Sequence, residues 1–252
     1  MKKTAPATSL RSPGSGGFTL METVIAIGVL AVLLTGFIAV FTPAAQGIRR
    51  SISSQQADRL TSTLTLELVT LRSGQPPATA ATGFEKAFTW LKEGNTAANA
   101  IFVYQYRGDV SLPLRADGTP QPNAAITGQP GEDYIVQSMA RRFGEIEDGK
   151  DMLEEDLKAV EGSVFFVKPT QLIYQGNQMV LGTPGTISFP GGAVQTPATT
   201  AAKYEDAVIA FSAEFHSPPT KSAAYLKGAS FVTRFDDNSK KPVFTRNLAV
   251  RR

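Results

Sequence analysis

The stretch that decides the architecture is GSGGFTLMETVIAIGVLAVLL, residues 14–34. From Phe18 to Phe41 the chain has 24 residues, and Glu22 is the only charged one among them. A helix rises about 1.5 Å per residue, so a run of this length spans a hydrocarbon layer of about 30 Å. The sequence therefore predicts a membrane-spanning helix over 18–41 with a carboxylate near its start.

Glu22 needs an explanation, because a carboxylate at the centre of a membrane helix costs roughly 2.5–3.5 kcal/mol and usually marks a function. A secretory signal peptide would account for the basic start, but its apolar run has about 7–15 residues and ends at a small-residue cleavage site. A plain signal anchor would take its orientation from the side that carries more basic residues. Here basic residues precede the run and Arg49 and Arg50 follow it, so this rule defines the orientation only weakly. Neither class of segment explains Glu22.

A third class does. The residues Gly17-Phe18-Thr19-Leu20-Met21-Glu22, followed by Thr23–Ile27, resemble the prepilin signature of type IV pilins and type II secretion pseudopilins. The resemblance implies cleavage after Gly17 by prepilin peptidase at the cytoplasmic face of the inner membrane. It also implies N-methylation of the new terminal residue, Phe18. Glu22 then becomes the fifth residue of the mature chain, where this family carries glutamate.

The chemistry of Glu22 agrees with this role. Packed apolar helices in a filament leave each new N-terminal ammonium poorly solvated, and the Glu22 carboxylate of a neighbouring subunit can pair with it. Removing one partner of such a buried pair typically costs about 3–5 kcal/mol, so the pair sets the axial register between subunits. Gly17 gives the peptidase an unhindered backbone. The chain departs from the family in having Gly16, not a basic residue, before the cleavage site.

The expected domains are a leader over 1–17, the membrane and assembly helix over 18–41, an amphipathic continuation of that helix over 42–72, and a globular head over 73–252. Pro43 removes a backbone hydrogen bond and should kink or locally melt the helix. Apolar residues of the continuation recur at three- and four-residue steps, which is typical of a helix with one buried face: Ile48, Ile52, Leu60, Leu64, Leu68 and Leu71.

The head is predicted to be α+β with an antiparallel sheet, because short helices are followed by a run of strands and turns. The resemblance implies a pilin-like fold, in which the long N-terminal helix packs on that sheet. The expected helices cover 84–91 and 151–160, and the expected strands cover 101–106, 164–167, 172–174, 179–181, 207–215, 229–235 and 243–250. Residues 134–143 fit helix or strand, and 108–132 and 182–202 are expected as loops. Gly176-Asn177 predicts a hairpin turn.

The charge excludes one class of partner. The formal net charge is +3, but Lys2, Lys3 and Arg11 lie in the leader, and without them the basic residues equal the 22 acidic ones. The mature chain is thus balanced, and no nucleic-acid partner is expected. Two segments are locally unbalanced: residues 132–161 are acidic and residues 214–252 are basic. We hypothesise that these two faces meet between neighbouring subunits.

No catalytic pattern was found in the head. His216 is the only histidine and belongs to no metal-ligand spacing, so it is expected at a strand end on the surface. The acidic residues between Glu145 and Asp156 lack the spacing of a calcium loop and are expected as a solvated helix start. The chain has no cysteine, hence no disulfide or thiolate metal site. No catalytic residue, metal or cofactor is expected.

The expected function is that of a filament subunit and not of an enzyme. The large head favours a minor pilin or a type II secretion pseudopilin over a major pilin. The expected partners are prepilin peptidase, other pilin or pseudopilin subunits, and inner-membrane lipid before assembly, with the head outside the cytoplasm. The alternative is a membrane-anchored periplasmic or surface binding protein, or an enzyme, that uses a prepilin-like anchor.

Overall fold

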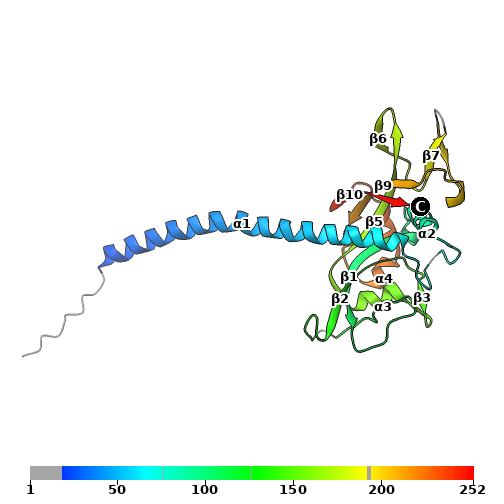
Figure 1. Ribbon diagram of the computed structural model, residues 1–252. Helices are drawn as coiled ribbons and strands as arrows, with labels where there is room; N and C mark the ends of the chain where they lie inside the picture. Colours follow the sequence, from blue (N-terminus) through cyan, green and yellow to red (C-terminus); the bar gives the residue numbers. More distant parts are fainter. Residues whose placement is uncertain (1–18, 76, 126, 192–193) are drawn as a thin grey trace, which may run out of the picture. The chain divides into compact units, whose positions relative to one another are not determined.

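The computed structural model describes residues 19–75, 77–125, 127–191 and 194–252, and for residues 38–54, 190–191 and 194–195 it describes the backbone alone. The chain forms two compact units, Met1–Ser54 and Gln55–Arg252, and the helix α1 (Leu20–Val69) belongs to both. The second unit combines helices with an antiparallel sheet (Figure 1). The predicted α+β class is confirmed.

α1 is helical throughout, including Pro43, so the expected local melting at Pro43 is wrong, while a bend there stays a prediction. The helix ends at Val69, three residues before the predicted Arg72. Two contacts end it there. The Lys86 ammonium donates to the carbonyl oxygens of Glu67 and Thr70, each at 2.6 Å, and so satisfies acceptors that a helix end leaves open. A Cβ on Gly83 would lie 2.0 Å from the Val69 carbonyl oxygen, so the next helix starts directly against this end.

The main sheet has the strand order β10–β9–β5–β1–β2, with all neighbours antiparallel. Its strands are β1 (Ile101–Asp109), β2 (Tyr134–Arg141), β5 (Val160–Gln175), β9 (Val208–His216) and β10 (Phe244–Arg251). β5 joins the two strands expected at 164–167 and 172–174 into one. Its outer half pairs with β6 (Gln178–Leu181). Gly176 and Asn177 have φ of 57° and 69°, which confirms the predicted hairpin turn.

Helices cover both faces of the sheet. On one face, Leu60, Leu64 and Leu68 of α1 pack with α2 (Gly83–Glu93) against strand residues such as Val103. On the other face lie α3 (Met152–Lys158), α4 (Ala223–Leu226) and α5 (Ala229–Asp236). The second unit is therefore a three-layer arrangement, and the first six residues of β1 are all buried because both of their faces are covered.

The expected strand over 229–235 is wrong, because these residues form α5. Phe231 and Phe235 are four residues apart and both lie buried on Phe166, at ring distances of 5.3 and 5.4 Å, whereas Val232 between them is exposed. This spacing fits one helical face. The ambiguous segment 134–143 forms the strand β2, and the helix expected at 151–160 is confirmed as α3, with Asp151 capping its start.

Several short elements complete the second unit. Before α3, the short strands β3 (Ile146–Glu147) and β4 (Lys150–Asp151) pair with each other in an antiparallel way. The segment 182–202, expected as a loop, contains β7 (Ser188–Gly191), β8 (Val194–Pro197) and the 3-10 turn η2 (Ala201–Lys203), while η1 (Ala97–Asn99) precedes β1. The hairpins β5–β6 and β7–β8 extend from the same end of the sheet (Figure 1).

Candidate functional site

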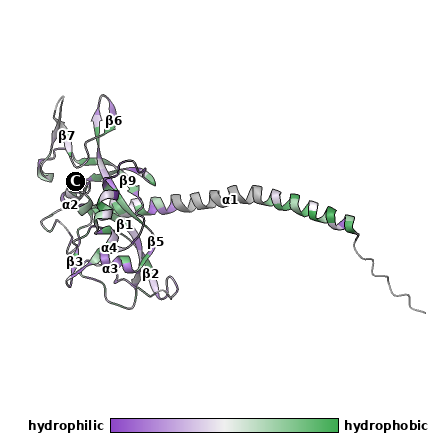
Figure 2. Cartoon of the chain, turned by 180° about the vertical axis from the view of Figure 1, so that it is seen from behind, coloured by the Kyte–Doolittle hydropathy of each residue, from purple (hydrophilic) through white to green (hydrophobic). Residues whose placement is uncertain are grey.

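The first candidate site is the N-terminal part of α1. Leu20–Phe37 has a mean hydropathy of 2.2, and none of its side chains is buried. Within the described part of the chain, this is the helix that is long and apolar enough to cross a membrane (Figure 2). The segment therefore presents an apolar surface with one ionisable group, Glu22, in its first turn.

Glu22 is held by the residue that begins the helix. Its carboxylate accepts hydrogen bonds from the Thr19 backbone N–H at 3.1 Å and from Thr19 Oγ1 at 3.2 Å. The backbone N–H of Glu22 donates to Thr19 Oγ1 at 3.3 Å. This is a capping box, whose Thr-x-x-Glu signal is visible in the sequence but was missed there. In the uncleaved chain, Glu22 thus has a partner in its own first turn, where negative charge is favoured. Gly17 and Phe18 lie outside the described residues.

The second candidate site is a cluster of buried charges in the head, centred on Arg141 of β2. The Arg141 side chain is fully buried and donates to three carboxylates that are buried as well: Asp117 at 2.7 Å, Glu145 at 2.8 Å and Asp156 at 2.9 Å. Its Nη2 also donates to Thr119 Oγ1 at 2.9 Å. One guanidinium therefore joins the loop after β1, the turn after β2, and α3.

The cluster extends in two directions. Asp156 also accepts from Tyr104 Oη and from Arg115, both at 2.6 Å. Burial and the Asp156 charge raise the pKa of Tyr104 well above its usual value, so this hydroxyl stays a donor. Every carboxylate oxygen of Asp156 thus has a charged or phenolic donor.

The other direction leads to the end of α1. Glu145 accepts from Gln75 Nε2 at 3.2 Å, and Gln75 Oε1 accepts from the Lys86 ammonium. Burial lowers the pKa of Lys86 to about 8, although Glu67 and Glu145 act against this shift. The ammonium also lies 4.6 Å from the ring centre of Trp90. A continuous chain of polar contacts therefore connects the last turn of α1 with Arg141.

These contacts correct one expectation. Glu145 and Asp156 were expected on a solvated helix start, but both are fully buried and paired with Arg141. Their carboxylates are fully engaged with cations and donors, so the cluster holds elements together and presents no free acid or base. Among the described residues, no three His, Asp or Glu side chains are arranged to hold a metal ion.

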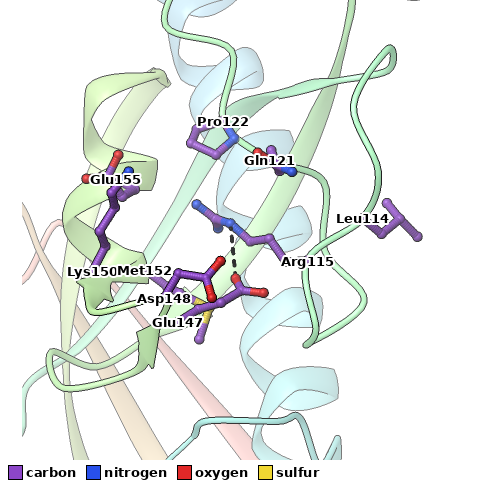
Figure 3. Close-up of a pocket in the computed structure, with 9 residues that line it drawn as sticks. All are labelled: Leu114, Arg115, Gln121, Pro122, Glu147, Asp148, Lys150, Met152 and Glu155. Carbon is purple, nitrogen blue, oxygen red and sulfur yellow. Dashed lines mark ion pairs between the residues drawn. The ribbon is translucent and has the colours of Figure 1, made fainter.

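A cavity of about 330 Å³ lies beside the cluster (Figure 3). Arg115 lines it, with its Nε 3.8 Å from the Glu147 carboxylate. Asp148, Lys150 and Glu155 also line it, and Leu114 points away from these charged groups. The cavity combines acidic and basic side chains with no nucleophile beside a base, so it shows no catalytic arrangement.

His216 ends β9 as expected, but the expectation of a surface position is wrong. The residue is 3% exposed, and its ring stacks on Phe166 at 5.2 Å. Nε2 lies 3.4 Å from Glu214 Oε2. Burial lowers the pKa of His216, with the Glu214 contact acting against the shift. His216 reaches a cleft of about 760 Å³ that Lys168 and other polar residues line, where nothing completes a catalytic triad.

Some charged groups of the predicted acidic and basic segments pair with each other within one chain. Lys227, from the basic segment, reaches Glu154 at 2.6 Å and Asp151 at 3.7 Å, both in the acidic segment. These groups are therefore less available to a neighbouring subunit. Lys240 and Lys241 are exposed, and a contact of theirs with another copy stays a prediction.

Comparisons of the chain with protein families, with curated proteins and with solved structures give no match. What is established is therefore the architecture: an exposed apolar N-terminal helix long enough to cross a membrane, and an α+β unit whose sheet is covered on both faces.

Proposed function

We propose that the chain is a structural subunit of a type IV pilus or of a type II secretion filament, as a minor pilin or pseudopilin with a pilin-like fold. The observation that carries this proposal is the exposed apolar helix Leu20–Phe37 with Glu22 as its only ionisable group, directly after the Gly17-Phe18 signature. A membrane anchor alone has no use for a carboxylate at this depth, whereas a filament does.

In this proposal the precursor lies in the bacterial inner membrane with its head outside the cytoplasm. Prepilin peptidase removes residues 1–17, and the new amino terminus of Phe18 is methylated. The Glu22 carboxylate then gives up its hydrogen bonds to Thr19 and forms an ion pair with the terminal ammonium of Phe18 in a neighbouring subunit. The packing of Leu60, Leu64 and Leu68 on the sheet supports a subunit in which the assembly helix continues into the head.

The mass of the mature chain tests the proposal. The full-length protein is produced in a bacterial host with and without a prepilin peptidase, and the membrane fraction is analysed by mass spectrometry. We expect loss of residues 1–17 and one added methyl group on Phe18 only when the peptidase is present. Gly17→Val is the matched control and should block cleavage. An intact Met1, or a cut near residue 45, would contradict the proposal and favour the alternative of a membrane-anchored binding protein or enzyme.

A further inference from the structure

The strand β10 (Phe244–Arg251, red in Figure 1) is the last strand at one edge of the main sheet. Among the described residues it pairs with β9, and the register is continuous over all eight of its residues. The strand contains no proline and no glycine. Natural proteins usually interrupt an exposed edge with a proline, a bulge or a covering segment, because a regular edge accepts further strands. β10 is such a regular edge.

Every second residue of β10 directs its backbone groups toward the outer edge. The Arg252 N–H donates to the Ala207 carbonyl oxygen at 2.9 Å, so these two residues form a hydrogen-bonded pair. In an antiparallel ladder, such pairs alternate with pairs whose N–H and C=O groups point away from the partner strand. Counting back from Arg252, the residues that point away, all of them exposed, are Arg251, Ala249, Asn247 and Thr245. We call these four residues the β10 edge.

The β10 edge therefore offers donors and acceptors at the spacing of a strand. One of its acceptors, the Thr245 carbonyl oxygen, is reached by Arg246 Nη1 at 3.2 Å, and the Arg246 side chain also pairs with Asp58 at 2.9 Å. The contact to Thr245 comes from a mobile type of side chain at the start of the strand. The middle of the edge, at Asn247 and Ala249, is where a further strand finds the backbone most directly.

The other edge of the sheet, at β2, is closed by its own chain. The Gly131 N–H donates to the Tyr134 carbonyl oxygen at 2.7 Å at the start of β2. Just after the end of the strand, the Arg142 N–H donates to Glu145 Oε1 at 3.0 Å. The last three residues of β2 are buried. Of the two edges that the described residues form, β10 is thus the one suited to accept a further strand.

The hydrophobic core reaches the sheet edge at β10. Phe244 and Leu248 are partly buried and pack against the core cluster that includes Leu60 of α1. The Phe244 ring stacks on Phe215 of β9 at 4.3 Å. Side chains two residues apart on a strand share a face of the sheet, so an added strand would place every second side chain beside this layer. The side chains on that face of the added strand are expected to be apolar.

The charge around β10 restricts the partner further. Residues 238–252 contain no acidic residue and five basic ones, which are Lys240, Lys241, Arg246, Arg251 and Arg252. A second copy of β10 would bring the same basic residues, and like charges that face each other destabilise paired strands. Asp58 compensates Arg246, whereas Arg251 is exposed on the β10 edge itself. A strand with acidic side chains on the face of Arg251 is therefore favoured.

We infer that β10 binds an extended segment of a partner protein as an added strand, in which apolar and acidic residues alternate. The hydrogen bonds to the β10 edge supply the affinity, and the alternate side chains supply the selectivity. The apolar side chains extend the layer of Phe244 and Leu248, and the acidic ones lie on the face of Arg251. The interaction goes beyond the proposed filament and does not depend on it, because β10 belongs to the compact unit Gln55–Arg252.

A synthetic peptide tests the inference. The probe is a fluorescent peptide of eight residues that alternates valine and glutamate, and its anisotropy is measured with the full chain in detergent. We expect saturable binding. A peptide with lysine in place of glutamate should bind at least tenfold more weakly. A peptide with N-methyl groups on two consecutive central residues, which blocks either edge of the peptide, should also lose at least tenfold.

Substitutions on the β10 edge locate the binding. Ala249→Pro removes an N–H that points away from β9, so it should weaken binding about tenfold and keep the ladder to β9. Ala249→Thr keeps this N–H and should change the affinity less than twofold. Arg251→Glu should weaken binding about tenfold by repulsion. Lys150→Glu makes the same charge change at an exposed residue of β4 and should change the affinity less than twofold.

The opposite results overturn the inference. These are no binding of the probe, equal binding of the N-methylated peptide, equal losses for Ala249→Pro and Ala249→Thr, or equal losses for Arg251→Glu and Lys150→Glu. Emission of Trp90, the single tryptophan, checks that each variant is folded. Dimers of the natural chain that Ala249→Pro abolishes, seen by light scattering, would assign the edge to a second copy. None of these variants should change the mature mass, so the proposed function is tested separately.

Discussion

Arg141 Nε lies 2.9 Å from Asp156 Oδ2, and both side chains are completely buried. Arg141 is on β2, at the edge of the sheet, and Asp156 is on α3, which covers one of its faces. The same guanidinium also binds Asp117 and Glu145. One buried cation therefore bonds to three buried carboxylates, of which Asp156 also pairs with Arg115, and it fixes a helix and two loops to the edge of the sheet.

Arg141→Met should destabilise the head strongly, because it leaves Asp117 and Glu145 buried without the cation that pairs with them, and it leaves Asp156 with Arg115 alone. Breaking a buried pair in this way typically costs about 3–5 kcal/mol. The free energy of unfolding of the full chain in detergent, from urea titration followed by Trp90 fluorescence, measures the effect. Lys158→Met removes the exposed pair with Glu155 and should cost at most about 1 kcal/mol. A similar small loss for Arg141→Met would contradict the role given to the cluster.

Gly83→Ala should destabilise the junction between α1 and α2. The added Cβ would meet the Val69 carbonyl oxygen at 2.0 Å, and backbone atoms on both sides must then move. A misfit of this kind usually costs about 1–3 kcal/mol. Gly28→Ala is the control, because no atom lies within 4 Å of its added Cβ and alanine favours a helix by about 1 kcal/mol. Thermal unfolding of both variants should show opposite or at least clearly different shifts; equal shifts would rule out the clash.

Glu22→Ala should separate processing from assembly. Cleavage after Gly17 should persist, because Glu22 is not at the cleaved bond, while incorporation into filaments should fall by more than tenfold for lack of the counter-charge. Mass spectrometry measures the first effect, and immunoblotting of sheared filaments measures the second. Thr19→Val removes the hydroxyl of the capping box and should cost the helix start about 1 kcal/mol. Normal incorporation of Glu22→Ala would refute the proposed pairing with Phe18.

His216 should make the stability of the head depend on pH below about 6.5. Burial lowers its pKa in the folded chain, so the unfolded chain binds more protons as the pH falls below the usual value of 6.5. The free energy of unfolding should therefore be highest above this pH and decrease from pH 6.5 toward 5.5. Urea titrations across this range measure the slope. His216→Phe keeps a ring on Phe166 and should flatten the slope; an unchanged slope would assign it to other groups.

The elements that the sequence predicts well are those whose signals are local. The apolar run after Phe18 and the turn at Gly176-Asn177 depend on neighbouring residues alone, and both are found where expected, the helix from Leu20 onward. The signal for the helix at 151–160 is also local, because Asp151 caps the helix by accepting a hydrogen bond from the Glu154 N–H three residues later. The capping box of Thr19 and Glu22 was equally local, and could have been predicted.

The elements that the sequence predicts poorly depend on residues far along the chain. Residues 229–235 have the composition of a strand, yet they form a helix because Phe231 and Phe235 fill the space over Phe166. His216 is buried and stacks on Phe166 of the neighbouring strand, and Glu145 and Asp156 are buried and pair with Arg141. Such partners have no fixed spacing in the sequence, so no periodicity could identify them.

The sequence by itself thus determined the apolar helix, the position of Glu22 in its first turn and the α+β class, because hydrophobic length and turn chemistry act between near neighbours. The tertiary structure alone decided where α1 ends and which charges are buried. Those properties follow from burial, which depends on what the rest of the chain places over each residue.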